Sequence, residues 1–153
     1  MDVSTERVAR ADPRKIFELA AAVQDWPRIL PHYRWVRVVA SEGKDVRTVD
    51  MAARRDVVGR IAIPLRWTAI QRVYPAETRI EFEHVAGITR GMRVTWTISP
   101  IGDSMALVKI RHVFAPRWPA PDLLVRAVVG EYFVNGVAQR TLGRICDLAQ
   151  RPS

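Results

Sequence analysis

Two histidines lie in segments where apolar and polar residues alternate. His84 has the same phase in this alternation as Phe82, and His112 has the same phase as Ile110. Because side chains two residues apart project from the same face of a strand, both imidazoles are expected to point into an apolar interior. Burial lowers the pKa of histidine through the neutral range, so such a pair could exchange protons with an enol or alkoxide. The plainer interpretation is that each imidazole satisfies a buried hydrogen-bonding partner.

Arg72 and Asn135 are the other polar candidates for a site. An arginine inside a cavity would need a carboxylate or an anionic ligand group, and it could polarise a ketone oxygen and stabilise an enolate. Arg72 can equally be an exposed arginine near the end of a strand. Asn135 lies in an apolar stretch of the C-terminal region. Its amide could hydrogen-bond a ligand carbonyl or lie on the surface of a helix.

The expected secondary structure around these residues begins with a short strand at residues 3–9 and two short helices. Asp12 followed by Pro13 is a strong signal for a helix start, and helical spacing of apolar residues continues to about Gln24. Asp25-Trp26-Pro27 repeats the same signal for a second helix, which Pro31 ends.

From Tyr33 onward the apolar period changes from 3.6 to 2, which predicts strands. The segment around Met92 and Trp96 places both side chains inward, together with Val94 and Ile98. Short turns join the segments, so neighbouring strands are expected to be antiparallel. The expected strands are 33–40, 46–57, 65–73, 78–85, 92–98 and one that contains 108–114. Gly59 and Pro64 bracket the expected connection between strands 46–57 and 65–73.

The last element is expected to be a long, unusually apolar helix over residues 122–150. A helix of ~28 residues is ~42 Å long and can lie across a whole sheet. The expected fold is therefore α+β, with a curved antiparallel sheet of about six or seven strands around one long helix. Such a sheet and helix leave a gap that few side chains can fill, and this gap predicts a ligand cavity.

Composition limits the classes of protein and partner. The 153 residues match one domain, residues 1–153, and 48% of them are hydrophobic. The net charge of +8 is spread without a run of like charges, so we expect no nucleic-acid partner. No stretch approaches the ~20 apolar residues of a membrane span, and no signal peptide is recognisable, so we expect a cytoplasmic protein. Cys146, the single cysteine, cannot form an intramolecular disulfide, and the two histidines lack an evident third metal ligand.

Two segments resemble the START-like (SRPBCC) superfamily. The stretch that reads V-Q-D-W-P-R-I-L-P-H-Y, residues 23–33, is similar to the W-P-x-x-x-x-x-Y entry segment of polyketide aromatase/cyclases and to the Y-P-x-F-L-P segment of coenzyme Q-binding relatives. Arg72-Val73 and the later G-I-T-R-G-M-R-V-T-W, residues 87–96, resemble the R-V … G-P-F … M-x-x-x-W pattern of the cyclases. The resemblance covers essentially the whole chain.

The resemblance implies a helix-grip fold that binds a polyketide, lipid, sterol or quinone between sheet and helix. Trp26 and Tyr33 would flank the cavity entrance, and Arg72 best matches the family's cavity arginine by position. The cyclases close rings on a carrier-bound poly-β-ketone without a metal or cofactor, so an acidic acyl carrier protein is a possible partner for a basic chain.

Two functions follow as hypotheses. The first is a polyketide cyclase/aromatase in which Arg72, His84 and His112 are catalytic. The second is a non-catalytic carrier of a lipid, quinone or aromatic metabolite, which needs only the cavity. In both cases Trp26, Tyr33, Phe82, Met92, Trp96, Ile110 and Asn135 are the candidate ligand-binding residues.

Overall fold

The computed structural model describes residues 1–58, 61–115, 123 and 136–152, and for 54–58 and 61–64 it describes the backbone alone. The chain begins with strand β1 (Asp2–Ala9), helix α1 (Pro13–Ala21), a 3₁₀ turn η1 (Val23–Asp25) and helix α2 (Trp26–Ile29). Six strands then follow one another, and the last described helix is α4 (Gln139–Gln150). The strands are β2 (Tyr33–Glu42), β3 (Val46–Val58), β4 (Ile61–Tyr74), β5 (Arg79–Gly87), β6 (Met92–Ile101) and β7 (Met105–Phe114), with a 3₁₀ turn η2 (Pro75–Glu77) between β4 and β5.

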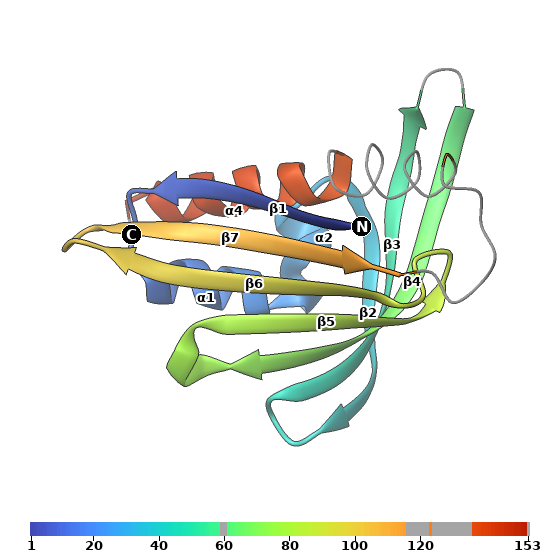
Figure 1. Ribbon diagram of the computed structural model, residues 1–153, viewed down its shortest axis with the longest axis horizontal. Helices are drawn as coiled ribbons and strands as arrows, with labels where there is room; N and C mark the ends of the chain where they lie inside the picture. The colour runs from blue at the N-terminus through green and yellow to red at the C-terminus, as the bar shows by residue number, and fades with distance from the viewer. Residues whose placement is uncertain (59–60, 116–122, 124–135, 153) are drawn as a thin grey trace.

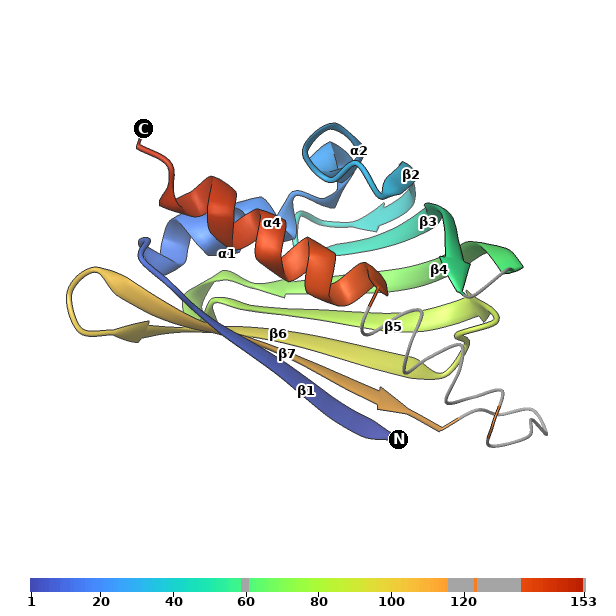
Figure 2. The same ribbon diagram turned by 90° about the horizontal axis from the view of Figure 1, so that it is seen from above.

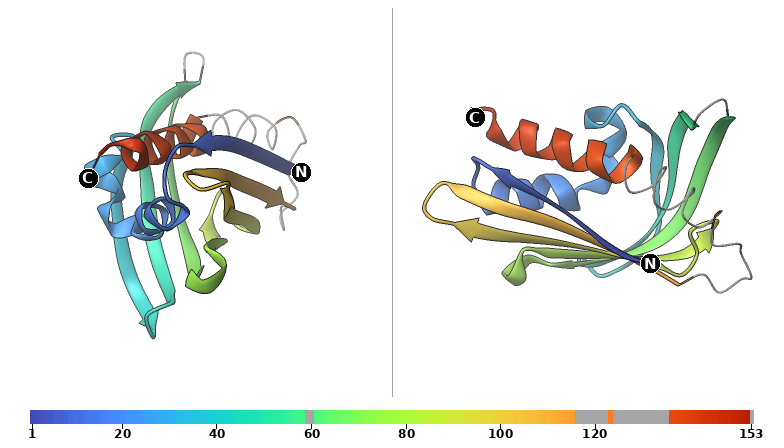
Figure 3. Two further views of the ribbon diagram at one scale, coloured as in Figure 1. Left: turned by 90° about the vertical axis from the view of Figure 1, so that its left-hand side faces the viewer. Right: turned by 45° about the horizontal axis from the view of Figure 1, so that its top comes forward.

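The seven strands form one antiparallel sheet in the order β1-β7-β6-β5-β4-β3-β2 (Figure 1). Helices α1 and α4 lie side by side on one face of this sheet (Figure 2). The sheet is strongly curved, and its concave side holds both helices (Figure 3). This arrangement confirms the expected α+β helix-grip fold.

Helix α1 begins as the sequence predicts. The Asp12 carboxylate accepts a hydrogen bond from the Arg14 backbone N–H at 2.9 Å, and Pro13 occupies the first helical position. The helix ends at Ala21 rather than near Gln24, because the chain tightens into η1 before α2.

The connection expected around Pro64 is wrong. Strand β4 starts at Ile61, so Pro64 lies inside a strand. The pairing of β3 with β4 is irregular between Ala53 and Asp56, opposite this part of β4. A proline is tolerated in a strand at such an irregularity, because no regular ladder hydrogen bond is required of it there.

The C-terminal helix is described from Gln139, and residues 136–138 before it have a π-helical turn. The expected start at Asp122 lies outside the described residues. Within the described helix, Leu142, Ile145 and Ala149 are buried against the sheet, as their helical spacing predicts. None of the helices in the part of the chain that the structure describes is long and apolar enough to cross a membrane.

Candidate functional site

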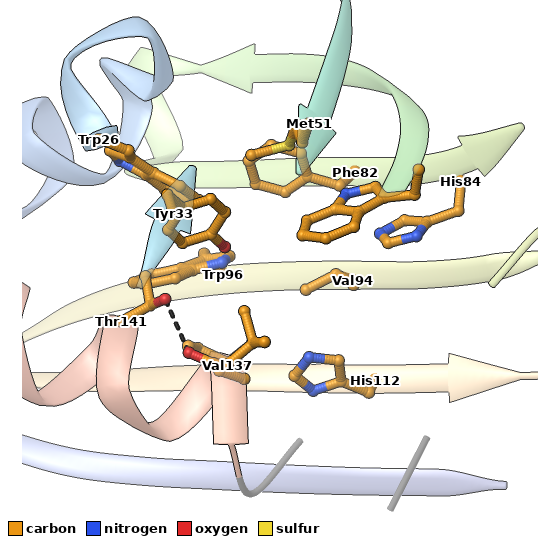
Figure 4. A pocket seen from close by; sticks show the side chains of 13 residues that line it. Trp26, Tyr33, Met51, Phe82, His84, Val94, Trp96, His112, Val137 and Thr141 are labelled. Carbon is orange, nitrogen blue, oxygen red and sulfur yellow. Dashed lines mark hydrogen bonds between the residues drawn. The ribbon is translucent and has the colours of Figure 1, made fainter. Parts of the chain in front are cut away.

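A cavity lies between the concave face of the sheet and the start of α4 (Figure 4). The empty space in it is about 370 Å³ when the part open to solvent is included. The centre of a water-sized sphere can occupy only about 40 Å³. It is therefore narrow, and its lining is mostly aromatic and aliphatic. The lining residues are Trp26, Tyr33, Trp67, Phe82 and Trp96, then Met51, Val94, Ile110, Val137 and Ala138, and the polar His84, His112 and Thr141.

The aromatic rings of the lining contact one another. The Trp26 ring centroid lies 5.1 Å from that of Tyr33, 6.1 Å from that of Phe82 and 6.3 Å from that of Trp96. The Trp26 indole N–H donates to the Leu19 carbonyl at 3.2 Å, which fixes the ring at the end of α1. This packing leaves ring faces and edges to meet a ligand, a surface suited to a flat hydrophobic molecule.

His84 is held on strand β5 by two neighbours. Its Nδ1 lies 2.7 Å from the Thr89 Oγ1, and its ring stacks on Trp67 with a centroid distance of 5.9 Å and an interplanar angle of 3°. Only 3% of the His84 surface is exposed, and Thr89 is fully buried. The imidazole is therefore fixed in position and orientation before any ligand binds.

The loop between β5 and β6 brings Thr89 back to His84. Gly87 and Gly91 both have positive φ angles, +97° and +98°. A Cβ on Gly87 would lie 2.5 Å from the Arg66 carbonyl oxygen on β4, so this position requires glycine. The Gly91 N–H donates to the His84 carbonyl at 2.9 Å and closes the loop.

His112 faces the same cavity from strand β7, on the other side of Val94 from His84 (Figure 4). Burial lowers the pKa of His112 to about 4. Burial also lowers the pKa of His84 to about 3, and the charge of His112 contributes to this lowering. Both imidazoles are thus neutral near pH 7, and the expected proton exchange at neutral pH is disfavoured because burial moves the pKa values well past that range.

The opposite end of the cavity carries Tyr33 and Thr141. Tyr33 is 4% exposed, and burial raises the pKa of its hydroxyl above the usual value, so the hydroxyl keeps its proton. The Thr141 Oγ1 donates to the Val137 carbonyl at 2.8 Å and lies 2.8 Å from Nε2 of the half-buried His32. The cavity therefore has polar groups at two ends with an aromatic middle.

Seven of the ten proposed site residues line the cavity, namely Trp26, Tyr33, Phe82, His84, Trp96, Ile110 and His112. Met92 is fully buried in the core but is not among the lining residues. Asn135 lies outside the described residues.

Arg72 lies on the outer face of the sheet, away from the cavity. The inward side chains of β4 are those of Trp67, Ala69 and Gln71, and the alternation turns Arg72 outward. Its Nη1 donates to the Glu83 Oε2 at 3.1 Å. The cavity position expected for Arg72 is therefore not found.

Three polar residues that line the cavity or hydrogen-bond to its surroundings were not identified from the sequence. Thr89 stands between two glycines, which is a signal for a loop but not for its contact with His84. Thr141 follows Ala138 at helical spacing on the apolar face of α4, so it could have been recognised as a polar residue on a buried stripe. His32 adjoins Tyr33 in the chain but contacts Thr141 only through the fold. Among the residues that the structure describes, no group of three His, Cys, Asp or Glu side chains could hold a metal ion.

Solved structures with the same fold include three of different origin. The Zhui aromatase/cyclase of a Streptomyces species is 20% identical, with a TM-score of 0.83 over 99% of this chain and 94% of that one. A START superfamily protein from Mycobacterium smegmatis is 18% identical, with a TM-score of 0.70 over 96% and 98% of the two chains. Norcoclaurine synthase from Thalictrum flavum is 12% identical, with a TM-score of 0.71 over 99% and 87%. Each likeness is one of fold.

No curated protein matches the sequence. A family model described as polyketide cyclase / dehydrase and lipid transport matches residues 10–138, which span most of the sheet. With the helix-grip fold and the internal cavity, this match establishes that the chain belongs to the polyketide cyclase/dehydrase and lipid transport family.

Proposed function

We propose that this protein binds an uncharged, hydrophobic and largely aromatic small molecule in the cavity between the sheet and α4. The observation that carries the proposal is the lining itself, in which five aromatic rings surround a narrow space closed at one end by two neutral imidazoles. Members of the family bind hydrophobic ligands, and burial of ring surface against aromatic side chains is a strong source of affinity.

The electrostatics of the cavity favour a ligand without charge. The titratable groups among the described lining residues, Tyr33, His84 and His112, are all neutral at pH 7. A buried carboxylate or phosphate would have no cation among these groups to offset its desolvation. Neutral imidazoles can still hydrogen-bond a ketone or hydroxyl oxygen, which would orient the ligand along the cavity.

A second candidate function is cyclisation of a carrier-bound poly-β-ketone, and the imidazole pair supports it. An imidazole N–H could donate to a ketone oxygen and polarise it, as neutral histidines do elsewhere. A bond would form between the enol carbon and the ketone carbon, and the ketone oxygen would take the proton that the enol releases. The new hydroxyl and a hydrogen from the adjacent carbon would then leave as water, and a carbon–carbon double bond would form between the two carbons. The low pKa values favour this hydrogen-bonding role over proton abstraction.

The first test is native mass spectrometry of the purified protein, followed by denaturation and identification of any released molecule. Tryptophan fluorescence gives a second readout, because Trp26, Trp67 and Trp96 all line the cavity. We expect a bound hydrophobic molecule, or a saturable change in emission when polycyclic aromatics are added. A protein that is empty and gives no response to aromatics, lipids or quinones would contradict the binding proposal.

The cyclase candidate has its own test. A poly-β-ketone on its carrier protein is incubated with wild-type protein, with His84→Ala and with Arg111→Ala, a surface control whose guanidinium pairs with Asp2. The candidate expects new cyclised products with wild type and the control, and their loss with His84→Ala. An unchanged product profile with wild type would leave ligand binding as the function.

A further inference from the structure

A second hollow lies on the convex face of the sheet, which none of the described helices covers (Figure 3). We call it the outer trough. It lies over β4, β5 and β6, and the centre of a water-sized sphere can occupy about 350 Å³ in it, compared with about 40 Å³ in the inner cavity. The residues that line it are mostly polar, namely Arg72, Tyr74, Glu81, Glu83, Arg93 and Thr95, with Phe82 and Val94 between them.

The pairing of side chains across the strands explains why the trough is open. Arg72 lies directly opposite Glu81 in the register of β4 and β5, but its Nη1 donates to Glu83 at 3.1 Å. The Glu81 carboxylate pairs instead with Arg79 of its own strand. The side chains of Arg72 and Glu81 are therefore held by different partners. Thr95, which lies opposite Glu81 on β6, is too short to fill the space between them.

The end of the trough around Glu83 has more positive than negative charge. Glu83 pairs with Arg72 and lies opposite Arg93 in the register of β5 and β6. Arg90 and Arg93 also line, with Glu83, a smaller hollow that adjoins the trough. The guanidinium groups of Arg90 and Arg93 are exposed and make no ion pair or hydrogen bond with any residue that the structure describes. One carboxylate is thus surrounded by three guanidinium groups.

The other end of the trough has the opposite balance. Arg79 pairs with both Glu77 and Glu81, and the Tyr74 hydroxyl donates to Glu81 at 3.4 Å. One guanidinium therefore meets two carboxylates, and a second anionic group of a ligand would be repelled there. An anion is favoured only at the Glu83 end.

We propose that the Glu83 end of the outer trough binds the phosphate or carboxylate group of a small polar molecule, with Arg93 as its main contact. A guanidinium presents N–H donors in a planar fork that matches two oxygens of such a group. The Arg72 guanidinium is held in place by Glu83 and carries further N–H donors beside the one used in that bond. The Thr95 hydroxyl lies in the same lining and can donate to another oxygen.

The outer trough is separate from the inner cavity and does not rest on the function proposed for it. Phe82 and Val94 belong to the lining of both hollows. Their side chains are buried on the concave side, so their backbone forms part of the floor of the trough. The two sites therefore lie on opposite faces of the same two strands, and one can be filled while the other is empty.

The test is an NMR titration of the protein at pH 7 with sodium phosphate and, separately, with sodium acetate. Sodium chloride keeps the ionic strength constant, because salt screens exposed charges. The variants are Arg93→Gln and Arg66→Gln. Arg66 is the matched control, since it lies on the same face of β4, about 20 Å along the strand from Arg72, and pairs with Asp50. Both variants lose one positive charge.

We expect saturable shifts of the Arg93 side-chain Nε–Hε signal and of the Thr95 amide with at least one of the two anions. Binding should be roughly fivefold weaker in Arg93→Gln and within about twofold of wild type in Arg66→Gln. Tighter binding of phosphate would assign a phosphate ester as the ligand class, and tighter binding of acetate would assign a carboxylate.

Two results would overturn the proposal. One is the absence of saturable shifts at Arg93 and Thr95 with both anions. The other is an equal loss of affinity in Arg93→Gln and Arg66→Gln, which would show a general attraction of anions to a basic protein. Arg93 is exposed, so its replacement should leave the dispersion of the amide spectrum unchanged, and this spectrum verifies the fold of the variant. The response of tryptophan fluorescence to aromatic ligands tests the inner cavity independently.

Discussion

The Nδ1 atom of His84 lies 2.7 Å from the Oγ1 atom of Thr89, and both residues are buried. His84 lies on β5 and Thr89 lies in the tight loop that follows this strand, so the short turn between β5 and β6 supplies the partner of a cavity histidine. A histidine of this kind has its ring orientation set by the protein rather than by the ligand.

Replacement of Thr89 by valine is expected to destabilise the protein by about 1–3 kcal/mol, because the change removes the hydrogen-bonding partner of a buried nitrogen. Urea denaturation measures this loss. Thr89→Ser is the matched control and should retain most of the stability. The ¹⁵N shifts of His84 should move in the valine variant and not in the serine variant, and equal shifts in both would show that Thr89 does not position the ring.

Gly87→Ala is expected to cost about 1–3 kcal/mol of folding free energy. The new Cβ would lie 2.5 Å from the Arg66 carbonyl oxygen, and the φ of +97° is unfavourable for a side chain. Gly102→Ala is the control, since φ there is +62° but no heavy atom lies within 4 Å of the new Cβ. Chemical denaturation of the two variants should give a clearly larger loss for Gly87, and equal losses would contradict the close approach to β4.

The stability of the protein should fall as the pH is lowered from about 6.5 toward 4. In the unfolded chain histidine titrates near 6.5, whereas burial lowers the pKa of His112 to about 4 and that of His84 to about 3. The unfolded state therefore binds more protons than the folded state in this window, and each histidine removes stability at up to ~1.4 kcal/mol per pH unit.

The measurement is urea denaturation at several pH values between 7.5 and 4, with His84→Gln/His112→Gln as the comparison. Carboxylates contribute to the acid dependence of both proteins, so the difference between the two curves isolates the histidines. A difference that does not change with pH would mean that the imidazoles are not held neutral.

Arg72→Ala should leave the affinity for aromatic ligands unchanged, because the guanidinium pairs with Glu83 on the outer face. The pair is more than one-third exposed on the arginine side, so its loss should cost less than about 1 kcal/mol. Tryptophan fluorescence titration checks the affinity, with Phe82→Ala as a variant expected to bind more weakly. A large loss of affinity in Arg72→Ala would contradict the outward position of this side chain and indicate that it contacts the ligand.

Local sequence patterns were sufficient to predict the order of the elements and the inward faces of β5, β6 and β7. Residues two apart in a strand share a face, so Phe82 and His84 lie on the same face as Ile80. Because Ile80 must be buried, that face is the inner one. The helix start at Asp12-Pro13 is similarly local, because the cap is made by neighbouring residues.

The face of the sheet on which Arg72 lies does not follow from its neighbours in the sequence. Hydropathy predicts the wrong faces for its neighbours, because the polar Gln71 is fully buried and the apolar Ile70 is half-exposed. The Gln71 amide donates to the Ala21 carbonyl at 3.0 Å and accepts from Arg47 at 2.8 Å. These partners come from α1 and β3, so local hydropathy carries no signal for this arrangement.

The chemistry of the cavity also depended on contacts between distant parts of the chain. His32 and Thr141 are separated by 109 residues, and the direction of their hydrogen bond follows from a third group, the Val137 carbonyl. The pKa values of His84 and His112 are likewise set by how completely the fold removes water around them. Alternation along a strand fixes which way a side chain points, but its partners and its dielectric surroundings exist only once the sheet has closed over the helix.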